Sequence, residues 1–307
     1  MRYIVLKKSL LAKVNERSSH TTPTPHGGGI AIAVTWFMGL IYLFTCKEID
    51  ARLFYALVAG GLLSIVSFMD DVYELSPKLR LLTQAFVSGL GLYALGGVTQ
   101  IDFGVVVLEN QLTVNALAFL GIMWFVNLYN FLDGIDGYAG SEAIFLALVG
   151  WLLFGGDHFI ILTASVAGFL VWNWHKAKIF MGDVGSTLLG YSIAIFIIYG
   201  QNNGVSVLIW LILFGIFWFD ATVTLYRRYK NGENLAVAHK KHAYQRLTQS
   251  GWSHRKVVVF GTLLNMVLAI LGYIAFHFQS LTLACFIMSL VLLYGVTRWV
   301  DSKKRFE

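Results

Sequence analysis

Residues 130–137 read NFLDGIDG and stand at the end of an apolar run, residues 114–131, that is long enough to cross a bilayer. Asp133 and Asp136 therefore lie at the rim of a predicted membrane span. Two further stretches share this placement: FMDDVYELSPKLR at 68–80, with Asp70 and Asp71, and IFMGDVGS at 179–186, with Asp183. Carboxylates are costly at a bilayer and are kept there mainly for function. These three stretches therefore decide both the fold and the search for a site.

The composition of the whole chain agrees with a membrane protein. It has 307 residues, a mean hydropathy of +0.67 and 13% charged residues, whereas soluble proteins have roughly 25%. We therefore expect an all-α polytopic integral membrane protein, with residues 1–307 forming a single domain. Ten candidate spans are predicted, at residues 29–46, 51–69, 79–96, 114–131, 138–155, 159–175, 184–200, 205–226, 257–278 and 280–299.

The basic residues predict how the chain is oriented. With the N-terminus in the cytoplasm, all of the 23 Lys and Arg residues except Lys47 and Arg52 fall on the cytoplasmic side. The net charge of +6 thus follows membrane topology, and no nucleic-acid partner is expected. The longest cytoplasmic loop, residues 227–256, is basic. Residues 97–113 alternate weakly and predict a small extracytoplasmic β-hairpin.

Several side chains on the predicted cytoplasmic side have the chemistry of a phosphate site. Adjacent carboxylates at Asp70 and Asp71 suit a metal ion or a proton transfer, and Lys78 and Arg80 could reach a phosphate. The hydroxyl of Thr24, in the glycine-rich SSHTTPTPHGGG motif at 18–29, could bond to one as well. The alternatives are an ordinary entry loop and an interfacial charged loop.

The remaining motifs point to a metal ion and a polar ligand. Asn130 and Asp133 are three residues apart, so they share one side of a helical turn. Asp183 can cap a helix or bind Mg²⁺ through oxygen. His239 and His242 are either solvated loop residues or contacts for an anionic nucleotide sugar. The spacing of an EF-hand and the cysteine partners of a zinc finger are both absent from the sequence.

These motifs, in this order, resemble those of the polyprenyl-phosphate N-acetylhexosamine-1-phosphate transferase superfamily, glycosyltransferase family 4. The resemblance extends from Arg17 to about Arg255. The stretch AHKKHAYQRL, residues 238–247, is most similar to the O-antigen-initiating subgroup that transfers N-acetylfucosamine or N-acetylquinovosamine phosphate. Members of the superfamily usually have one span before the SSHTTPTPHGGG motif, so the resemblance implies that the first family helix is missing here.

The resemblance implies a Mg²⁺-dependent enzyme, with Mn²⁺ as an alternative ion. It would transfer a sugar-1-phosphate from a UDP-N-acetyl-hexosamine to undecaprenyl phosphate at the cytoplasmic face of the bacterial inner membrane, next to membrane lipids, and a homodimer is a further candidate assembly. By this resemblance, Asp183 and Asn130 would bind Mg²⁺, Asp70 would be the base on the lipid phosphate with Asp71 beside it, and Lys78 and Arg80 would contact phosphates.

The resemblance also implies a nucleotide pocket. Its walls would include Asp133, Gly134 and Asp136, and Phe180 and Asn173 would contact the uracil. His239 and His242 would contact the sugar or the diphosphate.

Two other functions are alternatives to this one. The first is the related step of peptidoglycan synthesis, transfer of phospho-MurNAc-pentapeptide to the lipid; the translocase of that step carries a tri-histidine run that this chain lacks. The second is a proton- or ion-coupled secondary transporter. Transporters hold their acidic residues near the bilayer midplane on broken helices of inverted repeats, whereas these carboxylates lie at one rim.

Overall fold

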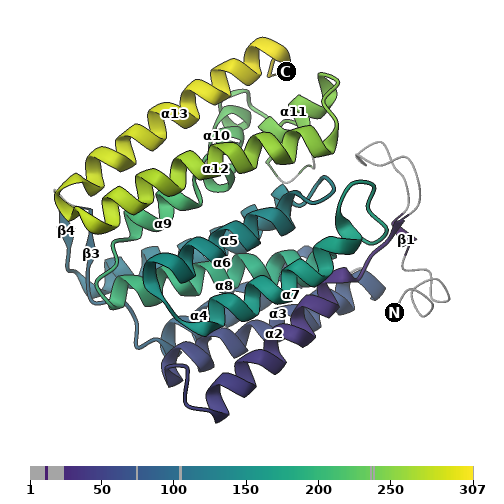
Figure 1. The fold of residues 1–307 in the computed structure, drawn as a ribbon. Coiled ribbons are helices and arrows are strands. Elements are labelled where there is room, and N and C mark those ends of the chain that lie inside the picture. The colour runs from purple at the N-terminus through teal and green to yellow at the C-terminus, as the bar shows by residue number, and fades with distance from the viewer. Residues whose placement is uncertain are drawn as a thin grey trace.

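Long helices running side by side make up most of the protein, and short strand pairs lie at the two ends of the bundle (Figure 1). The computed structural model describes residues 11–12, 24–73, 75–103, 106–235, 237 and 239–306. The helices are α2 (Gly28–Thr45), α3 (Ala51–Tyr73), α4 (Pro77–Ala94), α5 (Gln111–Leu132), α6 (Tyr138–Phe154), α7 (Asp157–Asn173), α8 (Gly182–Asn202), α9 (Val207–Leu213), α10 (Gly215–Lys230), α11 (Ala243–Gln249), α12 (His254–His277) and α13 (Thr282–Lys303), with a 3₁₀ turn at Gln279–Leu281. The strands are β1 (Leu11–Ala12), β2 (Thr24–Pro25), β3 (Ile101–Asp102) and β4 (Val107–Leu108); β1 pairs with β2 and β3 with β4, both antiparallel.

The predicted all-α membrane fold is confirmed. Six of the described helices are long and apolar enough to cross a bilayer: α2, α3, α5, α8, α12 and α13 extended by the preceding 3₁₀ turn. A seventh span is formed if α9 and α10, which are bent by 85° at their junction, count as one. The helices α6 and α7 are apolar but have 17 residues each. Each of the ten predicted spans coincides with a helix or with the α9–α10 pair, but the number ten is not confirmed.

The helix α8 lies at the centre of the bundle. Every residue from Val184 to Ile198 is buried. Close packing against α2 depends on glycines, since a Cβ atom on Gly29 would lie 2.2 Å from the backbone nitrogen of Gly185. The hydroxyl of Tyr191 donates a 2.7 Å hydrogen bond to the backbone oxygen of Ala56 in α3. The helix that begins with Gly182 and Asp183 is therefore held firmly from two sides.

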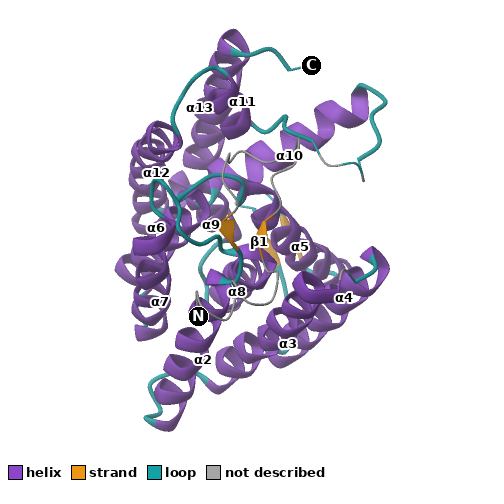
Figure 2. Cartoon of the chain, turned by 90° about the vertical axis from the view of Figure 1, so that its right-hand side faces the viewer, coloured by secondary structure: helices purple, strands orange, loops and turns teal. Residues whose placement is uncertain are grey.

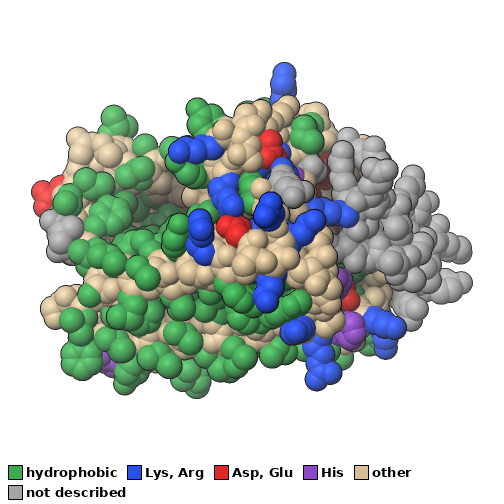
Figure 3. Space-filling model, turned by 90° about the horizontal axis from the view of Figure 1, so that it is seen from above, with side chains coloured by type: hydrophobic (Ala, Val, Ile, Leu, Met, Phe, Trp, Pro, Cys, Tyr) green, Lys and Arg blue, Asp and Glu red, His purple; other side chains and the backbone are tan. Residues whose placement is uncertain are grey.

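The two ends of the bundle differ in character. The hairpin predicted at residues 97–113 is present as β3 and β4 and lies at the end opposite the C-terminus (Figure 1). Figure 2 looks onto the other end, which carries β1, α11 and the C-terminus. Lys and Arg side chains gather toward that end, and hydrophobic side chains dominate away from it (Figure 3). The basic segment 227–256 is not a simple loop, because it contains α11 and the ends of α10 and α12.

Candidate active site

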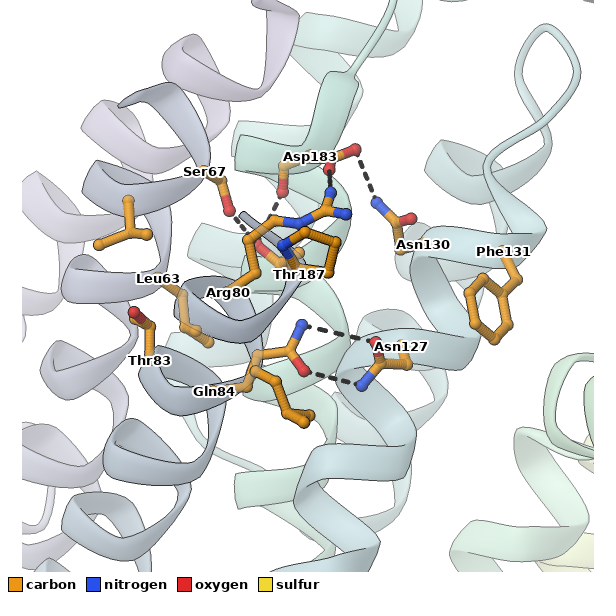
Figure 4. Close-up of a pocket in the computed structure, with 13 residues that line it drawn as sticks. Leu63, Ser67, Arg80, Thr83, Gln84, Asn127, Asn130, Phe131, Asp183 and Thr187 are labelled. Atoms are coloured by element: carbon orange, nitrogen blue, oxygen red, sulfur yellow. Dashed lines mark hydrogen bonds and ion pairs between the residues drawn. The ribbon is translucent and has the colours of Figure 1, made fainter. Parts of the chain in front are cut away.

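Two of the carboxylate stretches meet directly at the end of the bundle that carries α11. Asn130 lies in the last turn of α5 and Asp183 in the first turn of α8. The side-chain nitrogen of Asn130 donates to Asp183 Oδ1 at 2.8 Å (Figure 4). It also donates to Ser186 Oγ at 2.9 Å. The sequence motifs NFLDGIDG and MGDVGS therefore form one continuous polar surface.

Arg80 joins this surface to the third stretch. The helix α4 begins at Pro77, with the Ser76 hydroxyl accepting from the Leu79 backbone nitrogen, which is a favoured helix start. One turn in, Arg80 Nη1 donates to Asp70 Oδ2 at 2.9 Å and lies 3.7 Å from Asp183 Oδ2. The Arg80 side chain is 44% exposed, so it can also contact a ligand. Lys78 is exposed on the same turn.

The two adjacent aspartates have different surroundings. Both oxygens of Asp70 are engaged, since Oδ1 accepts from the Leu75 backbone nitrogen at 2.7 Å and Oδ2 accepts from Arg80. Asp71 accepts no hydrogen bond from the described residues. Its carboxylate lies against the start of α8, because a Cβ atom on Gly182 would be 3.5 Å from Asp71 Oδ2. Of the two, Asp71 is the carboxylate that remains able to accept a proton or a ligand.

A first cavity of about 280 Å³ opens below these charges, between α3, α4, α5 and α8. Figure 4 shows Arg80 and Asp183 at one end of it and the hydrogen-bonded pair of Gln84 and Asn127 farther in. Its other walls combine apolar side chains with hydroxyl and amide groups: Leu63, Val66, Pro77, Leu81 and Phe131; Ser67, Thr83, Thr187 and Asn130. A charged end above a partly apolar wall suits an amphiphile whose anionic head lies near Arg80.

The segment after α5 turns sharply around Asp133. Burial, and then the negative charge of Asp183, raise the pKa of the Asp133 carboxyl well above its usual range. The following residue has to be glycine, because a Cβ atom on Gly134 would lie 2.0 Å from the Tyr244 hydroxyl oxygen. That hydroxyl donates to the Phe131 backbone oxygen at 3.1 Å. The turn therefore packs directly against α11.

Asp136 is held at the other side of the same turn. His254 Nδ1 lies 3.3 Å from both the backbone nitrogen and Oδ2 of Asp136. The backbone nitrogen of Ala177 donates to Oδ2 at 3.2 Å. Burial by itself raises the pKa of Asp136, but the interactions with His254 and Ala177 outweigh it and lower the pKa below its usual value. Asp136 is thus a carboxylate at neutral pH.

A second cavity, of about 570 Å³, opens on this side of the turn. Its wall combines two aromatic rings, four basic side chains, six polar side chains and one alanine: Phe180 and Trp252; His175, Lys176, Lys240 and His254; Thr24, Asp136, Gln245, Thr248, Gln249 and Ser253; Ala177. Phe180 is fixed through its backbone, which donates to Pro25 O and accepts from Gly28 N, both at 2.9 Å. Aromatic and cationic groups together suit a ligand with a flat ring and phosphates.

Three of the predicted site residues lie behind the cavities and not in their walls. Asn173 is buried, and its amide accepts from Gly137 N at 2.9 Å and donates to Ile179 O at 3.0 Å. His242 is also buried, with Nδ1 3.8 Å from Asp220 Oδ1. The half-buried His239 has its ring centre 4.8 Å from that of His242. Their predicted substrate contacts stay predictions; in this structure they support the walls.

Other residues of the second cavity were not predicted as site residues. Among them are Trp252, His254 and Lys176. The one available signal in the sequence is that all three lie in basic segments that are predicted to be cytoplasmic. Their approach to Asp136 and Phe180 depends on contacts between segments far apart in the chain.

The side-chain oxygens around Asp183 could bind a divalent ion. Among the described residues, no three His, Cys, Asp or Glu side chains converge on one point. Mg²⁺ does not require such a cage, since it commonly binds one or two carboxylates together with substrate phosphates and water. Asp183 Oδ2 faces the first cavity, and Asp71 lies nearby. Asn130 presents its nitrogen to Asp183, so it would have to turn its amide to act as a ligand. With that change, the residues fit Mg²⁺.

Comparisons with known proteins identify the family of this chain. Residues 53–201 match the family model described as "Glycosyl transferase family 4". A Bacillus subtilis protein named "Probable undecaprenyl-phosphate N-acetylglucosaminyl 1-phosphate transferase" is 30% identical, over 96% of this chain and 85% of its own. A Yersinia pestis protein named "Undecaprenyl-phosphate alpha-N-acetylglucosaminyl 1-phosphate transferase" is 27% identical, over 96% of this chain and 85% of its own. A Mycobacterium tuberculosis protein named "Decaprenyl-phosphate N-acetylglucosaminephosphotransferase" is also 27% identical, over 99% of this chain and 85% of its own. The chain therefore belongs to glycosyl transferase family 4, the family of polyprenyl-phosphate N-acetylhexosamine-1-phosphate transferases.

Proposed function

We propose that the protein transfers an N-acetylhexosamine-1-phosphate from a UDP-sugar to undecaprenyl phosphate. One observation carries the proposal: two cavities of different character lie on either side of the Asn130–Gly137 turn. The first has Arg80 and Asp183 above a wall of apolar, hydroxyl and amide side chains, and it suits the phosphate end of a lipid. The second has aromatic and basic walls and suits a nucleotide diphosphate. The carboxylates between them mark where the two substrates meet.

The reaction forms one bond and breaks one. An oxygen of the lipid phosphate attacks the β-phosphorus of the UDP-sugar, and the bond from that phosphorus to the oxygen bridging it to the α-phosphorus breaks. UMP leaves with the bridging oxygen, and the lipid keeps the sugar through a diphosphate. Such a transfer needs positioning and charge neutralisation more than covalent catalysis.

The residues can be assigned to these needs. We assign Arg80 to the lipid phosphate and Phe180, with Lys176 and Lys240, to the nucleotide. We prefer Asp71 to Asp70 as the group that accepts a proton from the lipid phosphate, because both oxygens of Asp70 are already engaged. Mg²⁺, held by Asp183 with Asn130, would supply neutralisation of the diphosphate.

The donor and the membrane side are part of the proposal. UDP-N-acetylglucosamine is the leading donor, because the relatives described above are named for N-acetylglucosamine. A 6-deoxy donor such as UDP-N-acetylfucosamine or UDP-N-acetylquinovosamine is the second candidate, since the 238–247 stretch is similar to that subgroup, whose lipid product starts O-antigen synthesis. We place the active site on the cytoplasmic face, because almost all basic residues lie on that side.

A double-label experiment tests the function. Membranes containing the protein receive undecaprenyl phosphate and one UDP-sugar labelled both in the sugar and in the β-phosphate. We expect both labels to enter the lipid in equal amounts, with one UMP released per lipid, and EDTA to stop the transfer. Undecaprenol, which lacks the phosphate, serves as the control acceptor. Entry of the sugar label alone, or labelling of undecaprenol, would refute a sugar-phosphate transfer.

A further inference from the structure

The C-terminal segment contacts the basic segment 227–256 at α11, the helix whose Gln245, Thr248 and Gln249 line the second cavity. Asp301, near the end of α13, accepts hydrogen bonds from Arg227 Nη1 at 2.9 Å and from Arg246 Nη1 at 2.5 Å. Arg227 belongs to the last turn of α10 and Arg246 to α11. One carboxylate therefore joins the two helices that flank the segment carrying His239.

An aromatic ring adds to this connection. The guanidinium carbon of Arg227 lies 4.1 Å from the centre of the Phe306 ring, and that of Arg246 lies 5.4 Å from it. Lys241 Nζ is 5.6 Å from the same centre. Each distance is within the range of a cation–π interaction. Arg227 and Arg246 thus share one carboxylate and one ring, and Lys241, which pairs with Glu233 at 2.9 Å, shares the ring.

Arg246 depends strongly on these partners. Its side chain is only 3% exposed, and Nη1 also donates to the Lys304 backbone oxygen at 3.1 Å. A buried charge that loses its partner is left uncompensated, which is far less favourable than losing an exposed ion pair. Removal of the Asp301 carboxylate should therefore displace Arg246, and with it α11.

Displacement of α11 would change the second cavity. Arg246 Nε donates to the Lys241 backbone oxygen at 3.1 Å, and Gln249 Nε2 donates to the Lys240 backbone oxygen at 2.7 Å. The cavity wall includes Lys240 together with Gln245, Thr248 and Gln249 of α11. Neither Asp301 nor Phe306 lines that cavity.

We propose that Asp301 and Phe306, which we call the C-terminal latch, are positioning residues that hold α11 and the Lys240 segment in place to bind the UDP-sugar. The latch acts first on the donor side, because Arg246 and Gln249 hold the backbone of Lys241 and Lys240. Arg80 lies on another helix, and α11 meets the wall of the first cavity through Tyr244, near its start. This inference rests on the proposed function, since it takes the second cavity as the donor site.

The test compares Asp301→Asn and Phe306→Ala with Asp301→Glu, which keeps a carboxylate, and with Arg305→Ala, an exposed neighbour, as the matched control. Hydrogen–deuterium exchange over residues 239–250 is measured without substrate, and steady-state kinetics are measured for both substrates. We expect Asp301→Asn and Phe306→Ala to raise exchange and to raise KM for the UDP-sugar about tenfold. The KM for undecaprenyl phosphate should change less than the KM for the UDP-sugar, and Asp301→Glu should restore the donor KM toward that of the unmodified protein.

Two outcomes would overturn the latch. One is exchange over 239–250 that matches the Arg305→Ala control; the other is raised exchange with an unchanged donor KM. If Asp301→Asn fails to accumulate, Phe306→Ala still tests the latch, because Phe306 is only half-buried and its truncation leaves no buried charge unpaired. The exchange measurement needs no donor, and a failure of the proposed function appears separately, as absent transfer by the unmodified protein.

Discussion

Asn130 and Asp183 are 53 positions apart in the chain, yet the side-chain nitrogen of Asn130 donates a 2.8 Å hydrogen bond to Asp183 Oδ1. The same nitrogen also donates to Ser186, so it fixes the carboxylate of Asp183 against the first turn of α8. The second oxygen is left facing Arg80 and the first cavity. This arrangement makes Asp183 the best-placed carboxylate for contact with a cation and a phosphate.

Asp183→Asn should therefore nearly abolish transfer. The amide keeps the size of the side chain but removes the charge that would hold Mg²⁺ near the diphosphate, and the loss of a preorganised electrostatic contact typically lowers kcat by about 10²–10³-fold. The measurement is exchange of labelled UMP into the UDP-sugar, with Mg²⁺ titrated after EDTA treatment. Asp157→Asn, exposed at the start of α7, is the control. Full Mg²⁺-dependent exchange in Asp183→Asn would remove the metal role from this residue.

Arg80 should govern the use of the lipid substrate. Arg80→Ala removes a hydrogen-bonding cation, and such a contact is worth about 1.5–3 kcal/mol, so KM for undecaprenyl phosphate should rise roughly tenfold or more. Arg80→Lys keeps the charge but not the planar fork and should fall between. Arg52→Ala, exposed at the far end of α3, is the matched control. A rise in the UDP-sugar KM alone would contradict the assignment of Arg80 to the lipid.

His239 should make stability depend on mildly acidic pH. Burial, and then the positive charges of His242 and Arg228, lower the pKa of His239 to about 4, whereas an unfolded histidine titrates near ~6.5. Between these values the unfolded chain binds more protons than the folded protein, so stability rises with pH in this window and is lost on acidification. Tm is measured by thermal unfolding in detergent at about pH 7 and at about pH 4.5, which lie above and within the range where His239 titrates only in the unfolded chain. His239→Gln should reduce the fall in Tm between these two pH values.

The control for this effect is His277→Gln, at the C-terminal end of α12 and far from His239 in the chain. It should leave the pH dependence of Tm as it is in the unmodified protein. An equally steep fall in Tm for His239→Gln would show that other groups carry the acid sensitivity.

Much of the site could be predicted because membrane spans fix where their ends lie. A span has a limited length, so carboxylates placed after the runs at 51–69 and 114–131 must stand at a rim, and the basic residues indicate which rim. The pairing of Asn130 with Asp183 could not be predicted from spacing alone, because it depends on how α5 packs against α8. The different surroundings of Asp70 and Asp71 likewise depend on the direction of α4.

The helix α11 and the break between α9 and α10 could not be predicted from the sequence, because contacts with residues far away in the chain hold them in place. The short helix α11 begins where Ala243 N donates to both oxygens of Asp220, at 2.9 and 3.0 Å, and it is held at its other side by Asp301. The span expected at 205–226 is broken between α9 and α10. There Gly215 packs tightly, since a Cβ atom on it would lie 2.9 Å from a Leu293 methyl group. Local patterns carry no information on such neighbours.

A last prediction concerns a polar pair inside the bundle. Asn265 Nδ2 in α12 donates to Glu142 Oε2 in α6 at 2.6 Å, and both side chains are 3% exposed. Glu142 Oε1 and Asn265 Oδ1 have no partner in the described part of the protein. A buried carboxylate without a cation is costly, so a neutral group should serve equally well at position 142.

Glu142→Gln should therefore change the free energy of unfolding little, because a glutamine amide can accept from Asn265 Nδ2 and also donate to its oxygen. Glu142→Ala leaves both atoms of the buried Asn265 amide unpaired and should cost about 1–3 kcal/mol. Reversible unfolding in mixed detergent micelles measures both, with Glu109→Gln, exposed before α5, as the control. If Glu142→Gln were as damaging as Glu142→Ala, the charge of Glu142 would be required, and a cation would have to reach this site. Because α6 follows the Asp136 turn and α12 begins at His254, the pair also connects the two helices that lead from these walls of the second cavity.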